Sequence, residues 1–158
     1  SLVRTGLGTL SWLIGMQTAP SGVFRPVGSH SFGALRQPPE PFDQQPLEAA
    51  ATISACVAAW TATKNIKWKI EAERAFAWFM GANDLSIPLV DVKTGRCRNG
   101  LHPDRANENC GAESVVSYLL GLAEIRQLVR TRSAEPDDRP VVRLVPPRRP
   151  SIGSATLQ

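Results

Sequence analysis

Several features that would mark a particular class of protein are scarce in this sequence. Only three cysteines occur among its 158 residues, Cys56, Cys97 and Cys110, and this odd, sparse set indicates reduced thiols in a cytoplasmic protein rather than a disulfide framework. No apolar run approaches the ~20 residues of a membrane-spanning helix, so we predict no membrane span. No signal peptide opens the chain, which begins at Ser1 and is typical of a piece cut from a longer polypeptide.

An excess of charge of one sign is also missing. The net charge of +4 is small, and half of it lies in residues 131–158. No cluster of lysine and arginine alternates with aromatic residues, so we predict no nucleic-acid partner. The Gly-x-Ser-x-Gly elbow, the P-loop and the dinucleotide fingerprint are absent as well. We therefore predict neither a serine nucleophile nor a nucleotide cofactor, and no other cofactor is indicated.

The hydrophobic residues that are present recur with helical periodicity in four stretches. Val3, Leu7, Leu10 and Ile14 fall on one face of the first. The other three are expected at residues 46–60, 66–80 and 111–130. The helix at residues 46–60 opens with Pro46, a residue suited to a first helical position. The short gap at Lys64 and Asn65 predicts that the second and third helices form an antiparallel hairpin. No strand alternation flanked by hairpin turns is evident, so the predicted fold class is all-α.

Two irregular stretches, residues 18–45 and 83–110, are too long to be ordinary connections and are expected to be ordered, functional loops. The alternation of long loops and helix pairs predicts that both loops lie on one common face. After Arg130 the chain becomes rich in proline and arginine. We predict a helical domain over residues 1–130 and a disordered tail over residues 131–158.

The end of the first loop carries a polar cluster in the run Phe42-Asp43-Gln44-Gln45-Pro46-Leu47-Glu48. Asp43, Gln44 and Gln45 offer the donors and acceptors that recognise sugar hydroxyl groups. Glu48 could exchange a proton with a substrate. Its position also has a purely structural explanation, because carboxylates in a first helical turn are stabilised by the helix dipole.

The second loop contains Asp84, which we assign to substrate binding, and His102, a candidate acid or base near neutral pH. Cys97, His102 and Cys110 offer only three potential zinc ligands, and their spacing fits no common structural zinc site. We therefore predict no metal site.

Asn109 and Glu113 lie where the second loop enters the fourth helix. Glu48 and Glu113 would each stand at a helix N-terminus after a polar loop, and they could face each other across a cleft. Paired carboxylates about 5 to 9.5 Å apart are the groups that cleave glycosidic bonds. Glu48, Glu113 and His102 are thus the candidate catalytic residues, while Asp43, Gln44, Gln45, Asp84 and Asn109 are candidates for substrate binding.

Several blocks of sequence together resemble one bacterial family. They are Met16-Gln17-Thr18-Ala19-Pro20-Ser21-Gly22, Phe24-Arg25-Pro26-Val27-Gly28, residues 42–49, Ala75-Phe76-Ala77-Trp78-Phe79, Asn83-Asp84-Leu85, residues 95–104 and residues 107–114. In that family a group 1, GT-B type glycosyltransferase domain is followed by, or encoded with, a six-hairpin-glycosidase-like helical domain. The resemblance covers about residues 10–130, and the family pattern has Asp where this chain has Asn99 and Gln where it has Cys110.

The resemblance implies that this chain is the C-terminal part of an (α/α) toroid. It also implies a carbohydrate substrate and a GT-B glycosyltransferase domain as partner in the parent polypeptide. A carbohydrate-processing domain is one interpretation, and a non-catalytic module that binds a glycan or docks onto the transferase domain is another. A purely structural scaffold is a third, although it would not need two elaborate polar loops.

Overall fold

The computed structural model describes residues 1–29 and 40–134, without the side chains of residues 131–134. Four helices account for most of it: α1 (Leu2–Met16), α2 (Pro46–Thr63), α3 (Ile66–Phe79) and α4 (Ala112–Ala134). All four predicted helices are confirmed, and α4 extends past its predicted end at Arg130. No helix in the described part of the chain combines the length and apolar character needed to cross a bilayer. The predicted disordered tail falls almost entirely outside the described residues.

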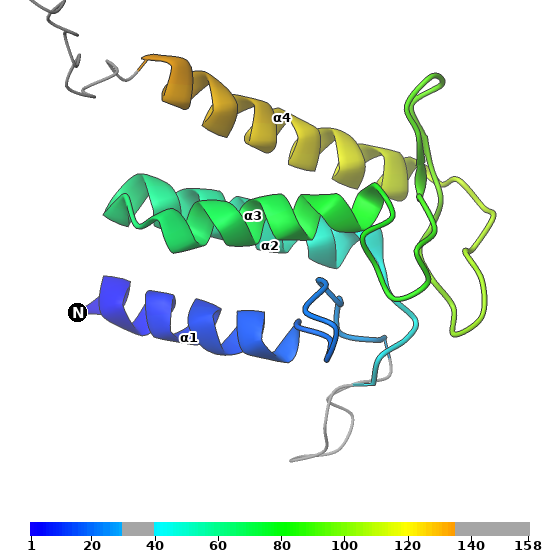
Figure 1. Ribbon diagram of the computed structural model, residues 1–158, viewed down its shortest axis with the longest axis horizontal. Helices are drawn as coiled ribbons and strands as arrows, with labels where there is room; N and C mark the ends of the chain where they lie inside the picture. The colour runs from blue at the N-terminus through cyan, green and yellow to red at the C-terminus, as the bar shows by residue number, and fades with distance from the viewer. Residues whose placement is uncertain (30–39, 135–158) are drawn as a thin grey trace, which may run out of the picture.

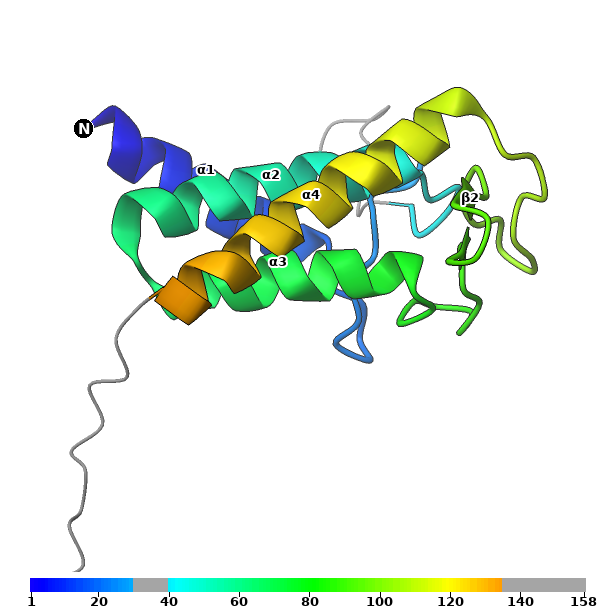
Figure 2. The ribbon, with the colours of Figure 1, turned by 90° about the horizontal axis from the view of Figure 1, so that it is seen from above.

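The helices form three layers, with the α2–α3 pair between α1 and α4 (Figure 1). The N-terminus and the turn between α2 and α3 lie at one end of the helices, and the described parts of both long loops lie at the other (Figures 1 and 2). A β-bridge between Gln44 and Leu101 joins the two loops directly. The prediction that they share one face of the domain is therefore confirmed, whereas closure into a toroid is not tested by four helices.

The hairpin of α2 and α3 follows from the two residues between them. Lys64 takes up the left-handed conformation (φ 54°) that ends α2, and its N–H donates to the carbonyl of Trp60. The side chain of Asn65 then caps α3 by accepting a hydrogen bond from the N–H of Lys67. The chain thus reverses within a single connection, as predicted.

The hydrophobic core lies where α4 crosses the α2–α3 pair. Gly121 allows this close approach, because a Cβ atom at that position would lie 3.0 Å from Ile53 Cδ1. Trp78 and Phe79 are fully buried, and Phe79 also packs against Tyr118 of α4. On its outer side α4 exposes Val116, Leu119 and Leu120. The helix is therefore apolar on two sides, which is typical of a helix that is covered on both.

A small sheet corrects the purely helical prediction. Strand β1 (Val90–Asp91) pairs antiparallel with β2 (Arg96–Cys97) in the second loop. Two-residue strands are too short to show alternation in a sequence, although Thr94-Gly95 between them is a dipeptide typical of turns. The turn is closed by Asp91, which accepts hydrogen bonds from the N–H of Lys93 and the hydroxyl of Thr94.

Gly100 is the residue that allows the two loops to meet. Its φ is +134°, and a Cβ atom there would lie 1.9 Å from the carbonyl oxygen of Gln44. We predict that Gly100→Ala lowers the free energy of unfolding by more than about 1 kcal/mol, because both the backbone conformation and the contact must change. Urea unfolding followed by tryptophan fluorescence measures this loss.

The matched control is Gly8→Ala in α1, where a Cβ atom would meet no neighbour within 4 Å. Alanine is a better helix former than glycine, so the free energy of unfolding of this variant should rise by up to about 1 kcal/mol. Equal stabilities for Gly100→Ala and the wild-type protein would contradict the role assigned to the contact between the loops.

Candidate functional site

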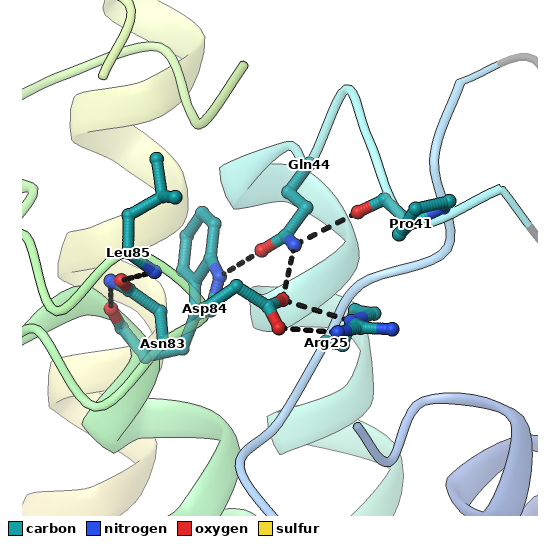
Figure 3. A network of polar contacts seen from close by, with 7 residues as sticks. Arg25, Pro41, Gln44, Asn83, Asp84 and Leu85 are labelled. Atoms are coloured by element: carbon teal, nitrogen blue, oxygen red, sulfur yellow. Dashed lines mark hydrogen bonds and ion pairs between the residues drawn. The ribbon is translucent and has the colours of Figure 1, made fainter. Parts of the chain in front are cut away.

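The loop end is organised around the buried side chain of Gln44, shown at the centre of Figure 3. Its Oε1 accepts a hydrogen bond from the indole N–H of Trp78 (2.7 Å). Its Nε2 donates to Asp84 Oδ2 (2.7 Å) and to the carbonyl of Pro41 (2.9 Å). The residue is only 1% exposed, so this amide serves the fold, and its predicted role in substrate binding receives no support from its surroundings.

Asp84 joins this network to the first loop through Arg25. The guanidinium group donates from Nε to Asp84 Oδ2 (2.9 Å) and from Nη2 to Oδ1 (2.5 Å), a bidentate pair. Burial alone would raise the pKa of Asp84, but the hydrogen bonds from Arg25 and Gln44 outweigh it and the pKa is lowered. Asp84 is therefore held as a charged anchor between the loops rather than presented to a ligand.

Asn83 fixes the chain segment that carries Asp84. Its Nδ2 donates to the carbonyl of Trp78, and its Oδ1 accepts from the N–H of Leu85 (Figure 3). Nδ2 and Oδ1 also bond the carbonyl and the N–H of Ile87. These contacts tie the segment after α3 to the last turn of that helix. The second loop thus starts from a rigid turn.

The Asp43 and His102 side chains form a pair between the two loops, with His102 Nδ1 2.6 Å from Asp43 Oδ1. A carboxylate only accepts hydrogen bonds, so Nδ1 carries the proton, and in a neutral ring Nε2 is then the acceptor. Both side chains are partly exposed, at 40% and 30%. An imidazole oriented in this way can take a proton from a ligand hydroxyl group or return it.

Two adjoining pockets lie beside this pair, and we refer to them together as the polar groove. The inner pocket, about 140 Å³, is lined by Asp43, Gln44, Gln45, Asn99, Gly100, Leu101, His102 and Asn107. The outer pocket, about 370 Å³, is lined by Gln45, Asn99, Asn107, Gly111, Ala112, Glu113 and Ser114. Amide and carboxylate groups predominate among the side chains, and this composition suits a ligand rich in hydroxyl groups.

Asn99 fixes the wall of the groove that α4 supplies. Its Oδ1 accepts hydrogen bonds from the N–H of Gly111 (2.7 Å) and from the hydroxyl of Ser114 (2.7 Å). Unpaired N–H groups at a helix start need such an acceptor. Here it comes from another segment of the chain, so α4 and the second loop hold each other in place.

Glu48 occupies a different environment from Glu113. It accepts a hydrogen bond from the backbone N–H of Val27, and burial raises the pKa of its carboxyl group above the ordinary value in spite of that bond. Its Oε2 is buried without a partner in the described part of the protein. Glu113, by contrast, is exposed and lines the outer pocket. The two carboxyl groups, expected to be similar, therefore differ: that of Glu48 is half-buried and that of Glu113 is exposed.

Five of the predicted site residues line this groove: Asp43, Gln44, Gln45, His102 and Glu113. The side-chain amide of Gln44 is nevertheless engaged with Trp78, Asp84 and Pro41. Asn109 contributes its backbone, since its carbonyl accepts from the N–H of Asn99. Three residues that matter here were not singled out from the sequence: Arg25, Asn99 and Asn107. Arg25 and Asp84 are 59 positions apart, and no local signal links them, whereas Asn99 and Asn107 stood in stretches that had already been called functional.

Metal binding receives no support from the geometry of the described residues, where no group of three or more His, Cys, Asp or Glu side chains is placed to hold an ion. His102 is engaged with Asp43. Cys97 is buried, and this burial raises the pKa of its thiol to about 12, with a smaller contribution from Cys110. A thiol held protonated in this way is a poor zinc ligand.

Comparisons of the chain with protein-family models, with curated proteins and with solved structures find no match.

Glu48 predicts a specific pH dependence of stability. Because its pKa is raised in the folded protein, the folded state binds the proton more tightly than the unfolded chain does. The stability that Glu48 contributes is complete below the ordinary pKa of 4.5 and is lost as the pH rises through the raised value. We expect Glu48→Gln to remove this loss, as measured by urea unfolding between about pH 4 and 8.

Glu73, an exposed glutamate of α3, supplies the control for that experiment. Glu73→Gln should leave the pH profile of stability as it is in the wild-type protein. If Glu48→Gln showed the same profile as the wild type, the burial of its carboxyl group would have no energetic effect.

The cap on α4 gives a second prediction from the site. Asn99→Ala should lower the free energy of unfolding by about 0.5 to 2 kcal/mol, as the loss of a helix cap does. Asn99→Asp should retain the two acceptor contacts. Its negative charge at the helix N-terminus should also raise the free energy of unfolding by up to about 1 kcal/mol. Asn109→Ala, in the same loop but with an exposed side chain, is the control, and an equal loss in both alanine variants would argue against the cap.

Proposed function

We propose that this protein is a carbohydrate-handling helical domain of a glycosyltransferase-type polypeptide, with its ligand bound in the polar groove. The observation that supports the proposal most strongly is the position of an oriented imidazole, His102, beside a groove lined by amide and carboxylate side chains. His102 would exchange a proton with a sugar hydroxyl group, and Asp43 would hold its ring. Gln45, Asn107 and Glu113 would bind further hydroxyl groups.

The resemblance to a six-hairpin-glycosidase-like domain agrees with this proposal and extends it. The described helices would be the C-terminal part of an (α/α) toroid in a cytoplasmic protein, next to a GT-B type domain that handles the nucleotide sugar. We keep Glu113 and His102 as the proposed catalytic groups. Glu48 enters the proposal only as a structural acid, because Val27 and the protein interior surround it.

The proposal predicts saturable binding of an oligosaccharide to the 158-residue protein. In a titration with neutral trisaccharides such as maltotriose, xylotriose and mannotriose, followed by ¹H–¹⁵N NMR, one of them should shift the side-chain amide signals of Gln45, Asn99 and Asn107. Glu113→Ala should then weaken binding about tenfold, the effect of losing one hydrogen bond to a charged group.

The control is Glu73→Ala, which removes an exposed helical glutamate that lines neither pocket of the groove and should leave the affinity unchanged. A folded protein with well-dispersed amide signals and no shift for any of these sugars would overturn the proposal. Equal effects of the two alanine substitutions would exclude the groove as the binding site.

A second candidate function is a non-catalytic module that binds a glycan or docks onto the transferase domain. Two observations favour it. Glu48 does not share the surroundings of Glu113, and α4 exposes Val116, Leu119 and Leu120 on a face that a neighbouring domain could cover. If the protein is such a module, both the wild-type protein and the His102→Ala variant should bind the glycan without turning it over. If it is an enzyme, the wild-type protein should turn the glycan over and His102→Ala should abolish this turnover.

A further inference from the structure

A third pocket adjoins the Asp43–His102 pair and shares no lining residue with the outer pocket. We call it the proline pocket; its volume is about 350 Å³, and it is lined by Glu40, Pro41, Phe42, Asp43 and Pro103. Asp43 lines both this pocket and the inner pocket of the polar groove. The two pockets therefore adjoin at Asp43.

The chemistry of the proline pocket differs from that of the polar groove. Its walls include one aromatic ring, Phe42, and two proline rings. Phe42 immediately precedes Asp43, and Pro103 immediately follows His102, so the residues that form the pair also carry the apolar walls beside it. Phe42 is partly buried and packs against the core, while the carbonyl of Pro41 is held by Gln44 at 2.9 Å. The core and Gln44 thus hold two of the three apolar residues of this pocket, Phe42 and Pro41, in place.

A hexose ring presents C–H groups on its faces and hydroxyl groups around its edge. The negative face of an aromatic ring attracts such C–H groups. The proline pocket thus suits the face of one sugar ring, whereas the polar groove suits the hydroxyl groups of another. Both the proline pocket and the outer pocket lie within the range of about 300 to 1,000 Å³ that is usual for small-molecule sites, so each is large enough for a sugar ring of its own.

We propose that the proline pocket is a second sugar subsite and that the ligand is an oligosaccharide of at least two rings, which spans the Asp43–His102 pair with one ring stacked on Phe42. This inference rests on the proposed function. In this arrangement His102 lies next to the bond that joins the two rings, and Glu113 contacts the ring in the polar groove.

The test compares ligands of different length made of the one sugar that binds in the titration above. Isothermal titration calorimetry on the 158-residue protein should show that the disaccharide and trisaccharide bind at least about tenfold more tightly than the methyl monosaccharide. Phe42→Leu retains an apolar side chain but loses the aromatic face, so it should weaken the binding of the disaccharide and trisaccharide about three- to tenfold. The affinity for the methyl monosaccharide, bound in the polar groove, should remain the same.

Phe76→Leu is the matched control, because Phe76 is another partly buried phenylalanine that packs against the core from α3; it should preserve the dependence on ligand length. If Phe42→Leu failed to fold, Pro103→Ser, at an exposed position, would replace it with the same expectation. Equal affinity for all ligand lengths would overturn the second subsite while leaving the proposed function intact. No binding of any sugar would overturn both.

Discussion

The buried side chain of Gln44 imposes the constraint on which the loop end of this protein depends. An amide without hydrogen-bond partners in the interior costs about 1 to 3 kcal/mol or more, so the partners of Gln44 must be brought to it. They are the indole N–H of Trp78 in α3, the carboxylate of Asp84 in the loop that follows α3, and the carbonyl of Pro41. Arg25 then neutralises the charge of Asp84. A single residue thereby joins both loops to the helical core.

Helical periodicity predicted the four helices because each has an apolar face, and Pro46 at the first helical position marked the start of α2. The cap that Asn65 provides for α3 was seen only in the structure. The layers could not be predicted in the same way, since α4 is apolar on its outer side as well as its inner side. Nor could the small sheet, whose two-residue strands depend on a turn closed by Asp91. Local patterns therefore indicated the elements, and long-range contacts decided their arrangement.

The sequence predicted which residues line the candidate site better than it predicted what each of them does there. Residue type alone suggested Asp43, Gln45, His102 and Glu113, and these line one groove. Residue type could not separate Gln44 from Gln45, although the first is buried and the second exposed. It likewise gave no reason to distinguish Glu48 from Glu113, because both stand in the first turn of a helix. The difference involves the first loop, whose Val27 N–H donates a hydrogen bond to the half-buried carboxyl of Glu48.

The segment from Asp43 to Gln45 runs in an extended conformation where it bridges Leu101, so successive side chains point to opposite sides. Asp43 and Gln45 consequently face the groove, while Gln44 between them faces the core. This alternation makes the spacing of the segment as important as its composition. A one-residue insertion or deletion here would exchange the two sets, directing a carboxylate into the core and the structural amide into the groove, so the length of this short stretch should vary much less than its residues do.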